Sequence, residues 1–202
     1  MTQCPRIQSV ETFIISIPRD TPYLGPLGPG ESINERGYLI RKGNRSIYPS
    51  TDMSVLIKVT AEDGTVGWGE TYGIVAPDAV TSIIDDVLGP VVIGRDPRDV
   101  VVIQEDLYDL MRVRGFFGGY YVDAIAGLDI AIWDLFGKLV GQPVVKLLGG
   151  QRMDTIPAYV SGLPRATLAE RVGLGREMQA RGFVAFKYAA AVSHEGIVNE
   201  MK

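Results

Sequence analysis

The chain has 202 residues, of which 46% are hydrophobic and 22% charged, a composition typical of globular proteins that bury a sizeable core. Its 20 Lys and Arg and 24 Asp and Glu leave a net charge of −4 without a long run of one sign, so neither nucleic acid nor an anionic membrane is expected as a partner. No apolar stretch reaches the roughly 18 residues of a membrane span, and with a single cysteine, Cys4, and no leader pattern the cytoplasm is the default compartment.

The first third of the chain predicts a strand, two loops and a hairpin. Residues 6–18 alternate between two apolar faces, which favours a strand over a helix. Residues 19–37, rich in Gly and Pro, and the polar residues 41–52 show no sustained period and are interpreted as loops. Residues 53–73 alternate on both sides of an Asp63-Gly64 turn and therefore predict a β-hairpin.

Two helical patterns follow the hairpin. Residues 77–89 and 97–115 each begin with a proline, which is favoured in the first turn of a helix, and each is expected to end at a glycine, Gly89 or Gly115. Three strands followed by helices indicate a small α+β module.

A longer helix and a β/α rhythm occupy the rest of the chain. The helix is expected to begin at Tyr120, with Asp123 as its N-cap, and to end at Gly141. Beyond Gly149-Gly150, the pattern predicts a strand, a helix, a strand and the start of a further helix over residues 155–162, 165–182, 183–190 and 193–202.

The strand at 183–190 carries one charge, Lys187, in an apolar stretch. Alternation places Lys187 on one face with Ala185 and Ala189, and the bulkier face, which is expected to meet the helices, comprises Val184, Phe186 and Tyr188. An unpaired ammonium is too costly to bury, so Lys187 must reach a substrate, a counter-ion or, if the strand lies at an edge, solvent.

The stretch 123–150 combines specific residue types at a specific spacing over more than two dozen residues: Ala124, Ala126, Asp129, Ala131, Asp134, Gly137, Lys138, Pro143, Leu147, Leu148 and Gly149. This combination resembles the mandelate racemase and muconate lactonizing enzyme branch of the enolase superfamily. The GWGE at 67–70 and the GRDP at 94–97 are similar to the capping domain of that family, so the resemblance extends over the whole chain. Ile132 departs slightly from the pattern.

The resemblance implies an α/β protein in two parts. An α+β capping domain, with a three-stranded antiparallel sheet plus helices, is expected at residues 1–120. Residues 121–202 would form a linking helix and the first β/α units of a TIM-like (β/α)7β barrel, which would be incomplete because such a barrel needs roughly 200 residues. We expect Asp129, Asp134 and Lys138 to be structural, holding the helix to the barrel, and Trp68 and Trp133 to belong to the core.

The resemblance also implies metal-dependent abstraction of a proton α to a carboxylate, with Mg²⁺ stabilising the charge that develops. The metal ligands are expected beyond Lys202 and none within this chain. Lys187 aligns with the first lysine of the family's Lys-x-Lys pair and is the candidate catalytic residue, whereas Ala189 stands in place of the second.

Because inversion needs acid/base groups on both faces of the intermediate, the loss of one lysine favours an acid-sugar dehydratase. The alternatives are a racemase or epimerase, a cycloisomerase, or a catalytically inert truncated fragment that acts as a binding or oligomerisation module. The expected partner is a small-molecule carboxylate, most simply a sugar acid, and the resemblance is compatible with a homo-oligomer.

In this family, loops of the capping domain select the substrate at the mouth of the barrel. Cationic and hydroxylated side chains in the two predicted loops would suit a polyhydroxy acid, although for any single one an ordinary solvated loop residue is an equally good interpretation. The candidate substrate-binding residues are Arg19, Tyr23, Arg45 and Tyr48, with Arg41 and Lys42 in the same segment.

Overall fold

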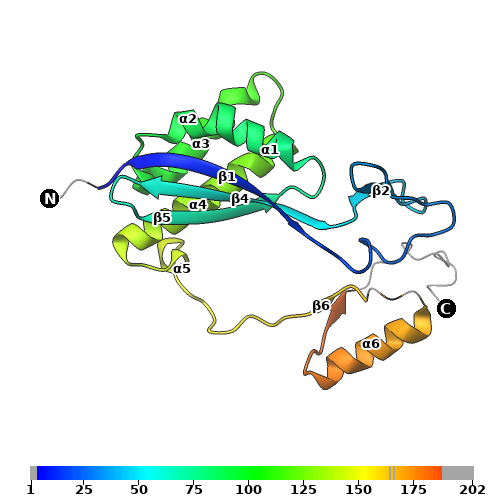
Figure 1. Ribbon diagram of the computed structural model, residues 1–202. Coiled ribbons are helices and arrows are strands. Elements are labelled where there is room, and N and C mark those ends of the chain that lie inside the picture. Colours follow the sequence, from blue (N-terminus) through cyan, green and yellow to red (C-terminus); the bar gives the residue numbers. More distant parts are fainter. Residues whose placement is uncertain (1–3, 164, 166, 188–202) are drawn as a thin grey trace. The chain divides into compact units, whose positions relative to one another are not determined.

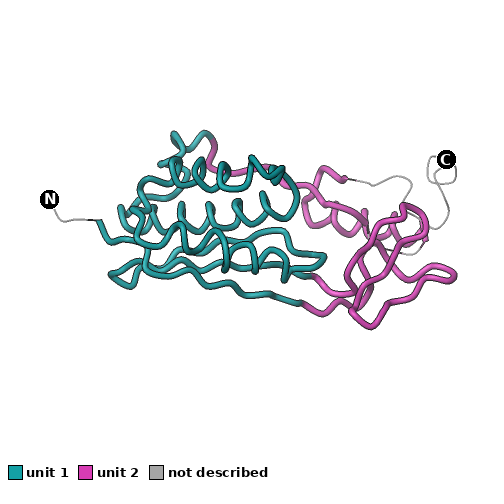
Figure 2. Tube along the Cα trace, turned by 90° about the horizontal axis from the view of Figure 1, so that it is seen from above, with its two compact units in different colours: residues 1–16, 53–152 teal, residues 17–52, 153–202 magenta. Residues whose placement is uncertain are grey.

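The computed structural model describes residues 4–163, 165 and 167–187. The chain forms two compact units, each made of two segments (Figure 2). Unit 1 comprises Met1–Ser16 and Met53–Arg152, and unit 2 comprises Ile17–Asp52 and Met153–Lys202. Packing therefore groups residues 121–152 with the sheet that precedes them, while the division of the chain into domains at residue 120 stays a prediction.

Unit 1 is built on a three-stranded sheet with the order β1-β4-β5 (Figure 1). The strands are β1 (Ile7–Ile17), β4 (Asp52–Ala61) and β5 (Val66–Tyr72), and β4 and β5 are antiparallel with Lys58 opposite Trp68. The predicted hairpin is confirmed, because its turn is closed by a hydrogen bond from the Gly64 N–H to the Ala61 carbonyl.

One face of this sheet is covered by helices and forms the core of unit 1. Along β4 every second residue is buried, which is the alternation expected when one face meets a core and the other does not. Helices α1 (Pro77–Ile83), α3 (Val100–Arg112) and α4 (Tyr120–Val140) contribute to the same core. The fully buried large side chains include Ile57, Val59, Ile84, Leu88, Ile103, Leu107, Leu128, Ile132 and Leu135.

The first helical segment does not end at Gly89 as predicted. A π-helical turn η1 (Ile84–Leu88) follows α1, and a short helix α2 (Gly89–Val92) continues from it. The Gly89 N–H donates to the Ile84 carbonyl in this wider turn, and Pro90 then lies in the first turn of α2, where no backbone donor is needed. The wider turn thus lets the chain pass a Gly-Pro pair without leaving the helix.

Helix α4 begins and ends at glycines. Gly119 is its N-cap, so the prediction of Asp123 as N-cap is wrong: Asp123 lies in the first turn, and its carbonyl accepts a hydrogen bond from the Thr71 hydroxyl. The predicted end at Gly141 is confirmed by a left-handed C-cap with φ of 64°. A short helix, α5 (Val144–Leu147), follows.

The side chains of α4 that match the family pattern fasten the helix to strand β5. The Asp134 carboxylate accepts from the Trp68 N–H at 2.8 Å and from Lys138 Nζ at 2.7 Å, and Lys138 Nζ also donates to the Val66 carbonyl at 2.9 Å. The expectation that they hold the helix to the barrel is therefore corrected for Asp134 and Lys138. Trp68, expected in the core, is 44% exposed on the outer face of the sheet, where its ring lies 6.0 Å from that of Phe13.

The GRDP segment forms a capped turn before α3. Asp96 accepts hydrogen bonds from the backbone N–H of Arg98 at 3.0 Å and from its guanidinium at 2.6 Å, at the start of the single 3₁₀ turn η2 (Pro97–Asp99). The hydrogen bond from the Arg98 side chain outweighs burial and holds the pKa of Asp96 at about 2. Ionised Asp96 thus satisfies donors that would otherwise be left unpaired where the helix begins.

We expect Asp96→Asn to lower the free energy of unfolding at pH 7 by about 1 kcal/mol, because the cap remains but the charge-assisted hydrogen bonds are lost. The folded pKa is depressed, so this stabilisation is present above the unfolded pKa of about 4 and is lost as the pH falls towards 2. Urea titrations at several pH values should show the gap between wild type and variant closing over that window. The exposed Glu105→Gln on α3 is the control, and a gap that stays constant down to pH 2 would contradict the assignment.

Unit 2 contains a small hairpin that the sequence did not predict. Strands β2 (Tyr38–Ile40) and β3 (Ile47–Pro49) pair antiparallel, with Leu39 opposite Tyr48. Strand β2 lies between the two predicted loops, and β3 lies inside the second of them, residues 41–52. Three residues are too few to show an alternating period, which explains why the pattern was missed.

The remainder of unit 2 is a β/α unit. Strands β6 (Val160–Ser161) and β7 (Phe186–Lys187) pair in parallel, joined by helix α6 (Leu168–Ala180), so the predicted parallel arrangement is confirmed. Thr167 and Glu170 form a reciprocal capping box at the start of α6. The predicted helix start at 193–202 lies outside the described residues. Within the described ranges, no helix has the length and apolar character needed to cross a membrane.

Candidate functional site

Lys187 lies on strand β7, beside Ser161 of β6 in the parallel register. The Gly162 N–H donates to the Lys187 carbonyl at 2.9 Å, which fixes this register. The neighbouring pair, Val160 and Phe186, lies one residue back, and Phe186 lines an apolar groove with side chains of α6. Because successive residues of a strand point to opposite faces, Lys187 and Ser161 share the face turned away from α6.

The bulky face of the predicted strand is only partly as expected. Phe186 faces helix α6 and lines the groove together with Leu168 and Val172 of that helix. Val184 does not: it precedes β7 and is 91% exposed, because the regular strand is shorter than predicted. Tyr188 and Ala189 lie outside the described residues.

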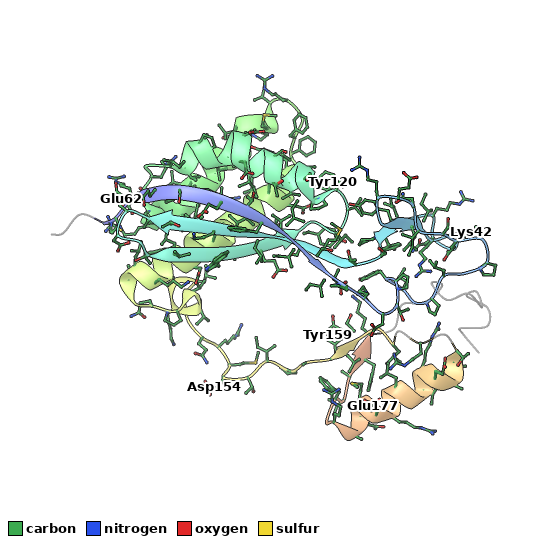
Figure 3. All side chains as sticks on the ribbon, viewed as in Figure 1. Lys42, Glu62, Tyr120, Asp154, Tyr159 and Glu177 are labelled. Atoms are coloured by element: carbon green, nitrogen blue, oxygen red, sulfur yellow. The ribbon has the colours of Figure 1, made fainter. Side chains whose placement is uncertain are left out.

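Ser161 is a candidate site residue that the sequence interpretation missed. Ser161 is exposed, and so is Tyr159, which directly precedes β6 (Figure 3). The signal that could have identified Ser161 is the alternation within 155–162 combined with parallel pairing of that segment to the lysine strand. A hydroxyl beside an ammonium offers both a hydrogen-bond acceptor for the lysine and a donor for a bound oxyanion.

The structure brings three of the four candidate loop residues together. The rings of Tyr23 and Tyr48 are stacked, with centroids 5.4 Å apart and planes inclined by 16°. The Arg19 guanidinium lies over the Tyr23 ring at 5.4 Å and forms an ion pair with Asp52. The Tyr48 hydroxyl accepts from Asn44 Nδ2 at 2.9 Å. The group of Arg19, Tyr23 and Tyr48, called the aromatic stack below, presents a cation and two phenol hydroxyls on one segment.

Arg45 is not part of the aromatic stack. It is exposed at a left-handed turn with φ of 58°, where its N–H donates to the Arg41 carbonyl at 2.8 Å. Lys42, on the loop beyond β2, is also exposed (Figure 3), and its Nζ donates to the Pro29 carbonyl at 3.1 Å. Both retain an accessible positive charge.

Arg41 does not offer a free cation to a substrate. Its side chain is 6% exposed and forms an ion pair at 2.7 Å with Glu31, whose side chain is 4% exposed. Burial alone would raise the pKa of Glu31, but hydrogen bonds from the Gly28 and Lys42 N–H groups and from Arg41 hold that pKa at about 2. Glu31 is therefore ionised within the interior of the loop, where it pairs with the Arg41 guanidinium.

The described residues do not fit a magnesium site. They contain no group of three or more His, Cys, Asp or Glu side chains placed to share a metal ion, whereas Mg²⁺ requires oxygen ligands in near-octahedral geometry. The chemistry that these residues can supply is that of Lys187, Ser161 and the aromatic stack.

Lys187 and the aromatic stack belong to the same compact unit, although the sequence separates them by more than a hundred residues. Unit 2, shown in magenta in Figure 2, joins segment 17–52 with segment 153–202. This grouping is what a site built from a capping loop and a barrel strand requires.

Curated relatives include enzymes that act on sugar acids or their lactones. A D-galactarolactone cycloisomerase from Agrobacterium fabrum is 36% identical over 137 residues, which cover 66% of this chain and 35% of that protein. A D-galactonate dehydratase from Xanthomonas campestris is 34% identical over 146 residues, which cover 70% of this chain and 36% of the dehydratase. The matched region thus spans about a third of the length of these relatives.

The fold is shared with a solved member of the enolase superfamily from Agrobacterium tumefaciens, with a TM-score of 0.91 and 53% identity over 98% of this chain and 51% of that structure. Residues 48–149 match the family model for the N-terminal domain of mandelate racemase / muconate lactonizing enzymes. These residues contain the hairpin, the helices and the fastening side chains of α4 described above. The chain therefore belongs to the mandelate racemase / muconate lactonizing enzyme family of the enolase superfamily.

Proposed function

We propose that the full-length gene product abstracts the proton α to the carboxylate of a sugar acid and then eliminates water from it. The observation that carries this proposal is the position of Lys187 beside Ser161, on the face of the parallel strand pair turned away from α6. The names of the relatives support a carboxylate or lactone substrate. An ammonium on this face of the strand pair is suited to hold the carboxylate group of that substrate.

Lys187 contributes by binding the transition state more tightly than the substrate. When a general base takes the α proton, the electron pair of the C–H bond enters the bond to the carboxyl carbon, and the carboxylate becomes an enediolate with a second negative charge. An ammonium beside these oxygens interacts more strongly with the dianion than with the monoanion, so the barrier falls. The Ser161 hydroxyl can donate a hydrogen bond to the same oxygens.

Elimination completes the reaction. The enediolate electrons form a carbon–carbon double bond as the β-hydroxyl leaves with a proton as water, and the resulting enol becomes a 2-keto-3-deoxy acid. This step requires no inversion at the α carbon, which is consistent with Ala189 at the position of the family's second lysine. Among the described residues, no three His, Cys, Asp or Glu side chains are placed to share a metal ion, and Lys187 acts on the enediolate through its own charge.

The capping loop would recognise the rest of the substrate. Arg19 is partly exposed and can pair with a distal carboxylate, and the phenol groups of Tyr23 and Tyr48 suit the hydroxyls of a sugar chain. Arg45 offers a further exposed cation on the same segment. A diacid would engage Lys187 at one end and a loop arginine at the other.

Cycloisomerisation of a lactone is the second candidate function. It is favoured by the 36% identity to the D-galactarolactone cycloisomerase. It shares the first step, because the lactone of a diacid keeps one free carboxylate, and the proton removed is the one α to that carboxylate. The two reactions differ in what leaves the β carbon: water in a dehydration, and the ring carboxylate in the opening of a lactone.

The proposal is tested by incubating the full-length gene product with D-galactonate, D-galactarate and galactarolactone in D₂O and following the products by ¹H NMR. We expect a 2-keto-3-deoxy product from at least one acid. An unsaturated or keto product from the lactone alone would favour the second candidate. A folded protein that neither converts any of these compounds nor exchanges an α proton with deuterium would contradict both and favour a binding or oligomerisation module.

A further inference from the structure

The capping loop contains a strained turn directly beside the aromatic stack. Leu24 adopts a left-handed conformation with φ of 71°, which side chains with a Cβ rarely adopt. Its predecessor is Tyr23, whose ring stacks on Tyr48, and its successor Gly25 has φ of 109°. Such strain persists only where surrounding contacts determine the conformation, and it concentrates at functional sites.

The guanidinium of Arg41 donates hydrogen bonds to the backbone on both sides of Leu24. Nε and Nη2 donate to the Tyr23 carbonyl at 3.1 and 2.5 Å, and Nη2 also donates to the Gly25 carbonyl. Nη1 donates to the Pro26 carbonyl at 2.9 Å and to Glu31 at 2.7 Å. These contacts can use all five N–H donors of the guanidinium, four of them on a short run of backbone.

Glu31 secures the other side of Arg41. Its Oε2 accepts from the Gly28 N–H at 2.9 Å in addition to Arg41, and its Oε1 accepts from the Lys42 N–H at 2.8 Å. Both carboxylate oxygens therefore bind within the loop. One buried pair thus ties the strained turn to the strand end that carries Arg41.

Net stability is a weak explanation for this pair. Removing two charges from water is costly, and a well-packed apolar pair often stabilises a fold as well or better. What a fully bonded guanidinium gives in addition is a single conformation of the backbone that it binds. Here that backbone is the turn at Leu24.

We propose that Arg41 and Glu31 are positioning residues that hold the left-handed turn at Leu24 and thereby present the aromatic stack to the substrate. The role in substrate binding rests on the proposed function, whereas the role in holding the turn does not. The β2–β3 hairpin positions both residues that contact Tyr23, since Arg41 directly follows β2 and Tyr48 lies on β3. The ring of Tyr23 is held by Tyr48, and its carbonyl by Arg41.

A double-mutant cycle in the full-length gene product tests this inference. The variants are Arg41→Lys, Leu24→Gly and the two combined, with the exposed Arg36→Lys in the same loop as control. Lysine keeps the charge but cannot donate four hydrogen bonds to three backbone carbonyls in a planar fork. Glycine accepts positive φ without strain, so the turn should persist in the double variant with less help from Arg41.

The first readout is hydrogen–deuterium exchange of a peptide that covers residues 23–31, which needs no activity. We expect Arg41→Lys to accelerate exchange there by at least about tenfold, Leu24→Gly to restore most of the protection in the double variant, and Arg36→Lys to change nothing. Additive effects of the two substitutions, or no change with Arg41→Lys, would overturn the role in holding the turn.

The second readout is the split between KM and kcat on the acid that the wild-type protein converts. In the Arg41→Lys variant the loop spends less time in the conformation that binds substrate. We therefore expect KM to rise about tenfold with a smaller change in kcat, and we expect Leu24→Gly to reduce this rise in the double variant. Accelerated exchange with an unchanged KM would overturn the link to substrate binding. If no acid is converted, the proposed function fails while exchange alone decides whether Arg41 holds the turn.

Discussion

Gly69→Ala is expected to destabilise unit 1 strongly. A Cβ at position 69 would lie 2.1 Å from the Gly127 carbonyl oxygen and 2.7 Å from the Ala131 N, both backbone atoms of α4. Neither atom can rotate away, so the helix itself would have to leave the sheet. The core between β4 and α4 would then open, at a cost on the order of 3 kcal/mol or more, beyond the usual penalty for overpacking.

Far-UV circular dichroism and urea denaturation of the purified variant measure this effect. Gly118→Ala, in the loop before α4, is the matched control, because a Cβ there meets nothing within 4 Å and its φ is not positive. That variant should remain within about 0.5 kcal/mol of wild type. A Gly69→Ala variant as stable as the Gly118→Ala variant would show that α4 does not lie as closely on β5 as described.

The two glycines of GWGE show what the sequence could and could not predict about this sheet. Alternation and the Asp63-Gly64 turn were enough to predict the hairpin, because both signals are local. The reason for Gly67 and Gly69 is not local: each allows backbone of a helix some sixty residues later to approach the strand. A pattern can identify such glycines, but only the packing explains them.

Other differences from prediction have equally specific causes. The helix after Pro77 passes Gly89 because a π turn changes the position of Pro90 in the helix, and a π turn has no sequence signal. The sequence does not predict the β2–β3 hairpin, because three-residue strands are too short to show an alternating period. Residue type predicts Asp123 as the N-cap, whereas Gly119 takes that place with a backbone conformation that favours glycine.

Within the candidate site, too, local sequence signals support predictions, whereas contacts between distant segments do not show in the sequence. Alternation alone predicts that Lys187 and Phe186 lie on opposite faces of their strand. The position of Phe186 in the groove beside α6 is consistent with that prediction. Ser161 depends on pairing between two distant segments, and the grip of Arg41 on Tyr23 and Gly25 depends on the fold of an irregular loop. Composition could suggest cations in the loop, but it could not show which one was already bonded.

Lys187→Met is expected to lower the activity of the full-length gene product by about a hundredfold or more while leaving the fold intact. Methionine keeps most of the side-chain volume and removes the ammonium. Lys187 is exposed among the described residues, so no buried partner is stranded by the change. The loss should appear in kcat, because the enediolate gains more from the ammonium than the bound carboxylate does.

Lys187→Arg separates charge from shape at this position. A planar guanidinium restores the charge but not the compact point charge next to Ser161, so we expect only partial recovery. The exposed Lys146→Met on α5 is the matched control and should retain wild-type turnover. Steady-state kinetics on the best acid of the panel provide the measurement. Turnover by Lys187→Met within about threefold of wild type would mean that the ammonium takes no part in the transition state, since a contact made only there would cost far more.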